Sequence, residues 1–143
     1  MRVAVGSDHA GFELKEFIKE YLESKGIDVV DVGTHSEERV DYPDFAKKVC
    51  EEVRKGADFG VLICGTGIGM SIAANKCKGI RAALCLYPEM ARLARRHNNA
   101  NVLVMAGRLM GKELAKWTIE AFMESEFEGG RHERRIRKLE EIE

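Results

Sequence analysis

The chain has 143 residues, of which 45% are hydrophobic, and its 23 basic and 24 acidic side chains leave a net charge of −1 at pH 7. This length predicts a single domain over residues 1–143 with a core of its own. A balanced charge argues against a nucleic-acid-binding protein, which is usually clearly basic. No apolar run is long enough for a membrane span, and no signal-peptide pattern opens the chain. The four cysteines show neither zinc nor disulfide-scaffold spacing, so we expect a cytoplasmic protein with reduced thiols.

Apolar runs that predict strands alternate along the chain with segments of helical periodicity. In chain order we expect a strand at 3–7, a helix at 14–22, a strand at 27–32, a helix opening at 41–44 and running to about 54, a strand at 59–64, a helix at 70–76, a strand at 80–86, a helix at 88–97, a strand at 101–106, and helices at 112–123 and 131–143. Near-continuous apolar strands that alternate with helices are typical of a parallel sheet covered on both faces. The sequence therefore predicts an α/β three-layer sandwich with a five-stranded parallel sheet, Rossmann-like or flavodoxin-like. Trp117, on one of the helices, is expected in the core.

A glycine-rich loop, Gly65-Thr66-Gly67-Ile68-Gly69, follows the strand at 59–64. Its glycines allow a tight turn that brings several backbone N–H groups to one point, and the helix N-terminus behind it adds partial positive charge. The loop therefore predicts a site for a phosphate or for an oxyanion formed during a reaction. It is not a P-loop, because no Gly-Lys-Ser/Thr follows, and it fits a dinucleotide fingerprint poorly. An ordinary tight turn without a ligand is the alternative.

Reactive side chains stand where two predicted strands end. Cys64 ends the strand before the glycine loop, and nearby N–H donors favour a thiolate, so Cys64 is a candidate base or nucleophile. A buried apolar role is the alternative for Cys64 and is our interpretation of the other three cysteines. Asp8 and His9 follow the first strand, at the edge where parallel sheets bind ligands. The alternative is a capping Asp8 and a surface His9.

Three basic residues in the last third of the chain are candidates for catalysis or for binding a phosphate. His97 ends a predicted helix, where it either takes part in chemistry or interacts with the helix dipole. Arg131 and Arg135 share one face of the last predicted helix, an arrangement that suits a phosphate. A solvated, salt-bridged helix is the alternative. The spacing of the four histidines predicts no zinc site.

Several short motifs occur in order along nearly the whole chain. They are Ser7-Asp8-His9-Ala10-Gly11, Asp41-Tyr42-Pro43, Cys64-Gly65-Thr66-Gly67-Ile68-Gly69, Ile72-Ala73-Ala74-Asn75-Lys76, His97-Asn98-Asn99-Ala100-Asn101 and Gly129-Gly130-Arg131-His132. Each motif alone is weak, but the ordered set is highly specific. Together they resemble the type B ribose-5-phosphate isomerases, a family that also contains galactose-6-phosphate and allose-6-phosphate isomerases.

The resemblance implies an aldose–ketose isomerase of the pentose phosphate pathway that interconverts ribose 5-phosphate and ribulose 5-phosphate through an enediolate, without a metal or cofactor. Cys64 would move the proton between C2 and C1, and Met70 stands where some relatives carry a glutamate, which favours the cysteine-based subgroup. His97, helped by Asp8 or Thr66, would open the sugar ring.

The resemblance also implies the residues that hold the substrate. Backbone N–H groups along the loop would bind the enediolate oxygen, namely those of Gly65, Thr66, Gly67, Ile68, Gly69 and Met70. Asn98 would bind sugar hydroxyls, with Asp8 also at the substrate. The phosphate would be held by four basic side chains: His9, Arg108, Arg131 and Arg135.

The resemblance further implies a homodimer or homotetramer with the active site at the dimer interface. We expect the helix at 131–143 to pack on a partner subunit, and His97, Asn98 and Arg108 to come from the chain opposite Cys64. Three other functions stay open: a six-carbon sugar-phosphate isomerase with a longer pocket, a non-catalytic phosphate-binding module, and an RNA-binding protein, which the charge balance disfavours.

Overall fold

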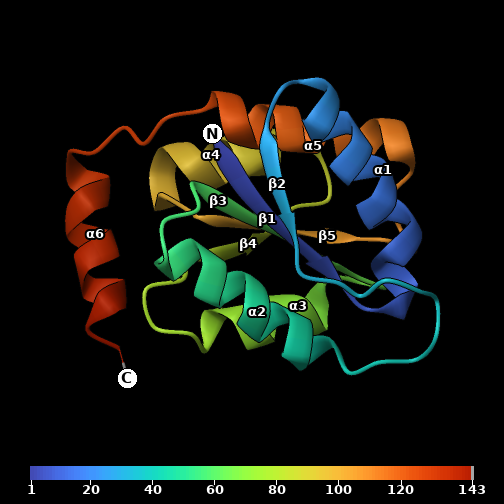
Figure 1. Cartoon of the computed structure of the whole chain (residues 1–143). Helices are drawn as coiled ribbons and strands as arrows, with labels where there is room; N and C mark the ends of the chain where they lie inside the picture. The colour runs from blue at the N-terminus through green and yellow to red at the C-terminus, as the bar shows by residue number, and fades with distance from the viewer. Residues whose placement is uncertain (143) are drawn as a thin grey trace.

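The computed structural model describes residues 1–142 and has a five-stranded parallel sheet at its centre (Figure 1). The strands are β1 (Arg2–Ser7), β2 (Asp28–Asp31), β3 (Phe59–Cys64), β4 (Ala82–Leu84) and β5 (Val102–Ala106). Their order across the sheet is β2-β1-β3-β5-β4, with every neighbouring pair parallel. The predicted α/β class and parallel sheet are therefore confirmed.

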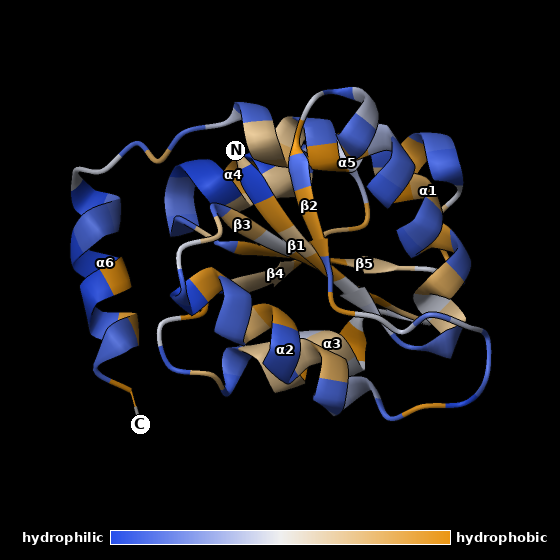
Figure 2. Cartoon of the chain, viewed as in Figure 1, coloured by the Kyte–Doolittle hydropathy of each residue, from blue (hydrophilic) through white to orange (hydrophobic). Residues whose placement is uncertain are grey.

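Helices cover both faces of the sheet and make the predicted three layers. One face carries α1 (Phe12–Ser24), α4 (Pro88–Asn98) and α5 (Lys112–Glu124), and the other carries α2 (Tyr42–Arg54) and α3 (Ile68–Asn75). A short 3-10 turn, η1 (His9–Gly11), joins β1 to α1. The central strands are apolar along their length because they are buried on both sides, and Figure 2 shows the hydrophilic residues gathered on the outer faces of the helices. No helix within residues 1–142 is both long and apolar enough to cross a membrane.

The last helix, α6 (Arg131–Glu140), stands apart from the two layers of helices, beside the edge where the strands begin (Figure 1). His132 and Ile136 are its buried residues, and Figure 2 shows an otherwise hydrophilic helix with its apolar residues turned toward the sheet. Arg81 ties its end to the body through an ion pair of 2.6 Å with Glu140. A cavity of about 1130 Å³ separates the end of α6 from the segment that joins α3 to β4.

Two local predictions need correction. Trp117 is 53% exposed, because Ala115, Thr118, Ile119 and Phe122 form the buried side of α5 and a residue two positions after Ala115 points away from it. The fourth strand is shorter than predicted and only half-buried, as suits an edge strand. The predicted opening of α2 is confirmed, with Asp41 as its N-cap residue, although the Asp41 side chain accepts no capping hydrogen bond.

The chain topology defines where a ligand can bind. β1 and β3 are neighbours, with Ser7 opposite Ile63, yet the helices that follow them cover opposite faces of the sheet. A crevice forms at such a switch point beyond the carboxyl ends of the strands. The segments after β1, β3 and β5 all meet there.

Candidate active site

Cys64 lies at the switch point, at the end of β3, and its free thiol is 5% exposed. Its backbone is fixed from both sides. The N–H of Asp8 donates to the carbonyl of Ile63 at 3.2 Å, and the N–H of Gly107 donates to the carbonyl of Cys64 at 2.8 Å. The ends of three strands therefore hold this cysteine at one place in the crevice.

The glycine loop turns directly after Cys64 into α3. Gly67 is the N-cap of α3 and has a φ of 78°, in the left-handed region that favours glycine. A Cβ at Gly67 would also lie 2.4 Å from Cδ1 of Leu84, and one at Gly69 would lie 2.7 Å from the ring of Tyr42. The loop is therefore closely enclosed, with the Tyr42 ring packed over its last glycine.

Most backbone amides of this loop have no partner. Within residues 1–142, only the N–H of Ile68 donates a hydrogen bond, to Oγ1 of Thr66 at 3.2 Å. The other five loop amides make none with these residues: Gly65, Thr66, Gly67, Gly69 and Met70. Unpaired amides at a helix N-terminus beside a thiol can bind an oxyanion that forms next to that thiol.

Asp8 and His9 lie beside Cys64, and each also has a structural role. Oδ1 of Asp8 accepts from the N–H groups of Ala10 and Gly11 at 3.0 and 3.1 Å, so the capping interpretation of Asp8 is confirmed for that oxygen. Nδ1 of His9 accepts from the N–H of Val40 at 3.2 Å. The neutral His9 ring therefore carries its proton on Nε2, which can donate to a ligand.

Arg108 lies against the glycine loop of its own chain. Its N–H donates to the carbonyl of Gly65 at 2.9 Å, and its guanidinium is so close that a Cβ on Gly65 would lie 3.1 Å from Nη1. The expectation that Arg108 comes from the chain opposite Cys64 is therefore wrong. β5 pairs with β3, so the residues that follow the two strands stay side by side.

A buried ion pair fixes the turn that follows β2 to the backbone at the end of β1. Nζ of Lys15, which is fully buried, donates to both carboxylate oxygens of Asp31 at 2.8 and 2.7 Å. Oδ1 of Asp31 accepts from the N–H of Gly33 at 2.9 Å, and the carbonyl of Gly33 accepts from the N–H of Ser7 at 2.8 Å. The pair therefore orders the backbone that precedes Asp8.

Four of the predicted site residues lie at the opposite edge of the sheet, near the strand starts. Asn98 ends α4 just before β5, next to His97, and Arg131 and Arg135 lie on α6. Gly60 of β3 pairs with Val102, whereas Cys64 pairs with Ala106, so His97 and Cys64 lie at opposite ends of these strands. At about 3.3 Å per residue, the length of β3 puts roughly 16 Å between the two groups. One copy of the chain therefore does not bring Cys64 and His97 together.

A second cluster surrounds His97. Its ring stacks on that of His132 with a centroid distance of 4.4 Å and an interplanar angle of 11°. Oε1 of Glu128 lies 3.8 Å from Nε2 of His97 and 3.6 Å from Nε2 of His132. The two imidazole nitrogens and the carboxylate oxygen lie within 4.8 Å of one another, a proximity that the spacing of the histidines in the sequence does not indicate. Burial, aided by the charge of His97, lowers the pKa of His132, which favours its neutral form.

Arg131 and Arg135 extend from this cluster and are exposed. Neither forms an ion pair with the other residues from 1 to 142, whereas Arg137 of the same helix pairs with Glu133. Their guanidinium groups are thus available to an anion that approaches α6.

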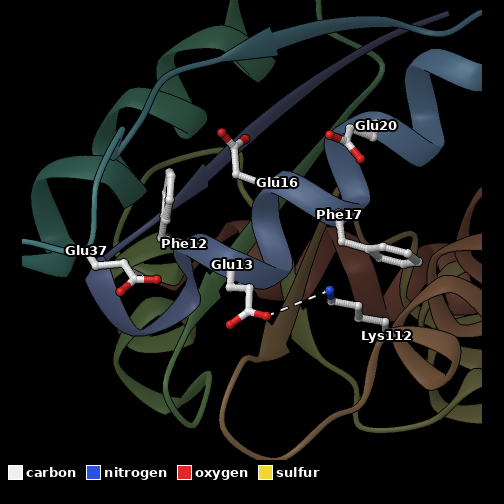
Figure 3. Close-up of a pocket in the computed structure, with 7 residues that line it drawn as sticks. All are labelled: Phe12, Glu13, Glu16, Phe17, Glu20, Glu37 and Lys112. Atoms are coloured by element: carbon white, nitrogen blue, oxygen red, sulfur yellow. Dashed lines mark ion pairs between the residues drawn. The ribbon is translucent and has the colours of Figure 1, made fainter.

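A separate hollow of about 260 Å³ lies between the starts of α1 and α5 (Figure 3). Its walls combine two phenylalanines, four glutamates and one lysine: Phe12, Phe17, Glu13, Glu16, Glu20, Glu37 and Lys112. Lys112 faces Glu13 across it at 3.7 Å. The excess of carboxylates disfavours an anionic ligand, so this hollow is a poorer candidate for an anion-binding site than the crevice at Cys64.

Sequence reasoning overlooked three residues that the structure places at these clusters. Tyr42 and His132 lie within the sequence motifs but were given no predicted functional role, and Glu128 lies outside every motif. The available signal was a tyrosine inside a motif and two titratable residues within two positions of the Gly129-Gly130 pair. Their partners, Gly69 and His97, come from distant parts of the sequence and could be found only in the fold.

Comparisons with known proteins agree over the whole chain. Residues 3–139 match the family model described as Ribose/Galactose Isomerase. Ribose-5-phosphate isomerase B of Escherichia coli is 48% identical over 99% of this chain and 96% of that relative. A crystal structure of a ribose 5-phosphate isomerase from Thermotoga maritima is 64% identical, with a TM-score of 0.97 over 99% of this chain and 98% of that one.

A further solved structure carries a ligand. Ribose-5-phosphate isomerase B from Mycoplasma genitalium, with bound ribulose-5-phosphate, is 44% identical, with a TM-score of 0.94 over 98% of this chain and 94% of that one. Fold, site and sequence thus point to the same group of proteins. The chain belongs to the ribose/galactose isomerase family.

Proposed function

We propose that this protein interconverts ribose 5-phosphate and ribulose 5-phosphate through an enediolate. The observation that carries the proposal is the buried Cys64 thiol beside five loop amides that have no partner in the described chain. The names of the relatives support the same substrate pair. No oxidant or hydride carrier enters this reaction, because the proton moves between adjacent carbons of one molecule.

The chemistry follows from the positions of the groups. The Cys64 thiolate removes the proton from C2 of the open-chain aldose, and the electrons move to the carbonyl oxygen to give the enediolate. The loop amides stabilise that oxygen, and each such donor contributes about 10²–10³ in rate. Cys64 then returns the proton to C1 while the proton of the C2 hydroxyl passes to the oxygen on C1, which gives the ketose. His97 opens the furanose ring before this step, and Asn98 binds the sugar hydroxyls.

Binding of the phosphate positions the carbons over Cys64. His9 and Arg108 are on the Cys64 side of the site, and Arg131 and Arg135 bring two further positive side chains. Energy from the remote phosphate group supplies the orientation that the proton transfer requires.

The site is completed by a second copy of the chain. Cys64 and His97 lie at opposite edges of one sheet, so we infer that His97, Asn98, Arg131 and Arg135 of one subunit face Cys64 of its partner. The way α6 stands apart from its own body fits a helix that packs on a neighbour. A dimer is the smallest assembly that forms such sites, and it is also the building block of a tetramer.

The first test is the isomerisation of ribose 5-phosphate without added metal. Removing a general base costs about 10²–10⁴ in kcat, so Cys64→Ala loses nearly all activity while it still binds a sugar phosphate. Cys85→Ala is the matched control, because Cys85 is equally buried but lies away from the site. A wild type that is inactive, or a Cys64→Ala variant that is fully active, would contradict the proposal.

Mixing two inactive variants tests the shared site. A dimer of one Cys64→Ala chain and one His97→Asn chain contains one site with both substitutions and one intact site. Random exchange of subunits should therefore restore about a quarter of the wild-type activity. If each site lay within one chain, mixing would restore nothing.

The family description also names galactose, so six-carbon sugar phosphates form the second candidate substrate class. Their phosphate is one carbon further from C2. Assays of allose 6-phosphate and galactose 6-phosphate beside ribose 5-phosphate decide between the classes, and we expect a higher kcat/KM for the pentose phosphate.

All four cysteines are free thiols, which fits a protein of the reducing cytoplasm.

A further inference from the structure

The cluster around His97 contains a carboxylate with no role in the mechanism above. Glu128 lies in the extended segment between α5 and α6, and its backbone N–H donates to the carbonyl of Arg96 at 3.0 Å. Nε of Arg96 donates to Oε2 of Glu128 at 2.7 Å, and Nη2 lies 2.5 Å from the same oxygen. A backbone hydrogen bond to Arg96 thus holds this segment, and two guanidinium nitrogens of the same residue hold the carboxylate.

The fixed carboxylate turns its other oxygen toward two imidazoles. Oε1 of Glu128 lies 3.8 Å from Nε2 of His97 and 3.6 Å from Nε2 of His132. His132 is 6% exposed, and its Nε2 is buried with no other hydrogen-bond partner. A small adjustment of either ring brings its Nε2–H within hydrogen-bond distance of Oε1.

The arrangement suits a shared carboxylate better than a metal site. The rings of His97 and His132 are stacked and only 11° from parallel, so their nitrogen lone pairs lie in two nearly parallel planes, whereas one metal bound by both rings would have to lie in both planes. The hydrogen bond from Arg96 lowers the pKa of Glu128, so the carboxylate is ionised at neutral pH. An anion beside an imidazole orients the ring and stabilises the imidazolium that forms when the ring takes a proton.

We infer that Glu128 is a positioning residue for ring opening, because it orients His97 and stabilises its protonated form while His132 supports the other face of the ring. The inference rests on the proposed function. It assigns Glu128 to the step that exchanges protons with the furanose and not to the transfer between C2 and C1, which belongs to Cys64 on the far side of the site.

The test separates these two steps in Glu128→Gln, with Glu126→Gln as control, since Glu126 is an exposed neighbour on the same segment. Ribulose 5-phosphate is acyclic, because its 5-oxygen is phosphorylated and cannot close a ring on C2. Deuterium uptake from D₂O at its C1 therefore reports enediolate formation without ring opening. Net conversion of ribose 5-phosphate requires both steps.

We expect Glu128→Gln to lower kcat for ribose 5-phosphate at least tenfold, while deuterium uptake stays within about threefold of wild type.

Two results would overturn the inference: a kcat equal to that of Glu126→Gln, or a parallel fall in deuterium uptake, which would mean that Glu128 supports the whole site. A thermal midpoint close to that of wild type excludes simple unfolding. A wild-type protein that neither isomerises nor exchanges deuterium would instead refute the proposed function.

Discussion

The buried pair of Lys15 and Asp31 offers a strong test of how the fold supports the site. Replacing Lys15 by Met keeps most of the length and the apolar stem of the side chain but removes its charge. Asp31 would then remain 9% exposed, with only the N–H of Gly33 and Nζ of Lys19, at 3.3 Å, as partners. The turn at Gly33, which holds the backbone of Ser7, would lose its anchor.

Breaking a buried ion pair on one side costs about 3–5 kcal/mol, and the remaining partners of Asp31 place this case near the lower end, at about 3 kcal/mol. An unfolding entropy of about 2.1 cal/mol/K per residue gives about 0.3 kcal/mol/K for 143 residues. The melting temperature should therefore fall by about 10 °C at fixed protein concentration. Lys19→Met is the control, because Lys19 is a third exposed and its pair should contribute less than about 1 kcal/mol.

Urea unfolding of Lys15→Met, Asp31→Asn and the double variant measures the coupling energy. The double variant should be more stable than Lys15→Met, because no uncompensated charge stays buried. Burial alone would raise the pKa of Asp31, but hydrogen bonds from Lys15, the N–H of Gly33 and Lys19 lower it below 3.8. Its stabilising contribution is thus present above that pH and lost as the pH falls further. A cost under about 1 kcal/mol for Lys15→Met, or strict additivity, would refute this reasoning.

Three further predictions concern packing and titration. Gly11→Ala should destabilise the fold by at least about 1–3 kcal/mol, because the new Cβ would lie 2.3 Å from the carbonyl oxygen of Ile63; an unchanged urea midpoint would contradict this. Burial lowers the pKa of His132 below 6.5, so protonation favours the unfolded chain and stability should fall as the pH drops below that value; His132→Phe should flatten this slope in urea titrations. Burial raises the pKa of Cys50 and of Cys85 to about 12, so mass spectrometry should find neither alkylated by iodoacetamide in the native protein at about pH 8, and both alkylated in urea.

Local patterns in the sequence are sufficient to predict the class of fold. The apolar strands and amphipathic helices lie within a few residues of their predicted positions, because each buries its own apolar face. The order of strands is not local information. β5 lies between β3 and β4, whereas β4 lies at the edge of the sheet. The apolar sequence of β5 alone does not show which of these two positions it takes.

The two halves of the site differed in how far the sequence could predict their geometry. Asp8 and Cys64 end parallel strands, so their meeting at one edge followed from the class of fold. The contacts of His97 with Glu128 and His132 depend on the path of residues 125–130, which reverses through Gly129 and Gly130 with φ of 71° and 57°. No periodicity reports such a path. Arg108 shows the same limit, because only the pairing of β5 with β3 places it on Gly65.

The open amides of the glycine loop have a consequence for how this protein can diversify. Their N–H groups belong to the main chain, so exchange of a neighbouring side chain leaves them in place as long as Gly67 keeps its left-handed φ. The side chains that we propose to bind the phosphate, such as Arg108 and Arg135, can change without altering those donors. Under the proposed function, substitutions can therefore change which sugar fits while the amides that stabilise its oxyanion stay in place, and losing those amides requires a change at the glycines themselves.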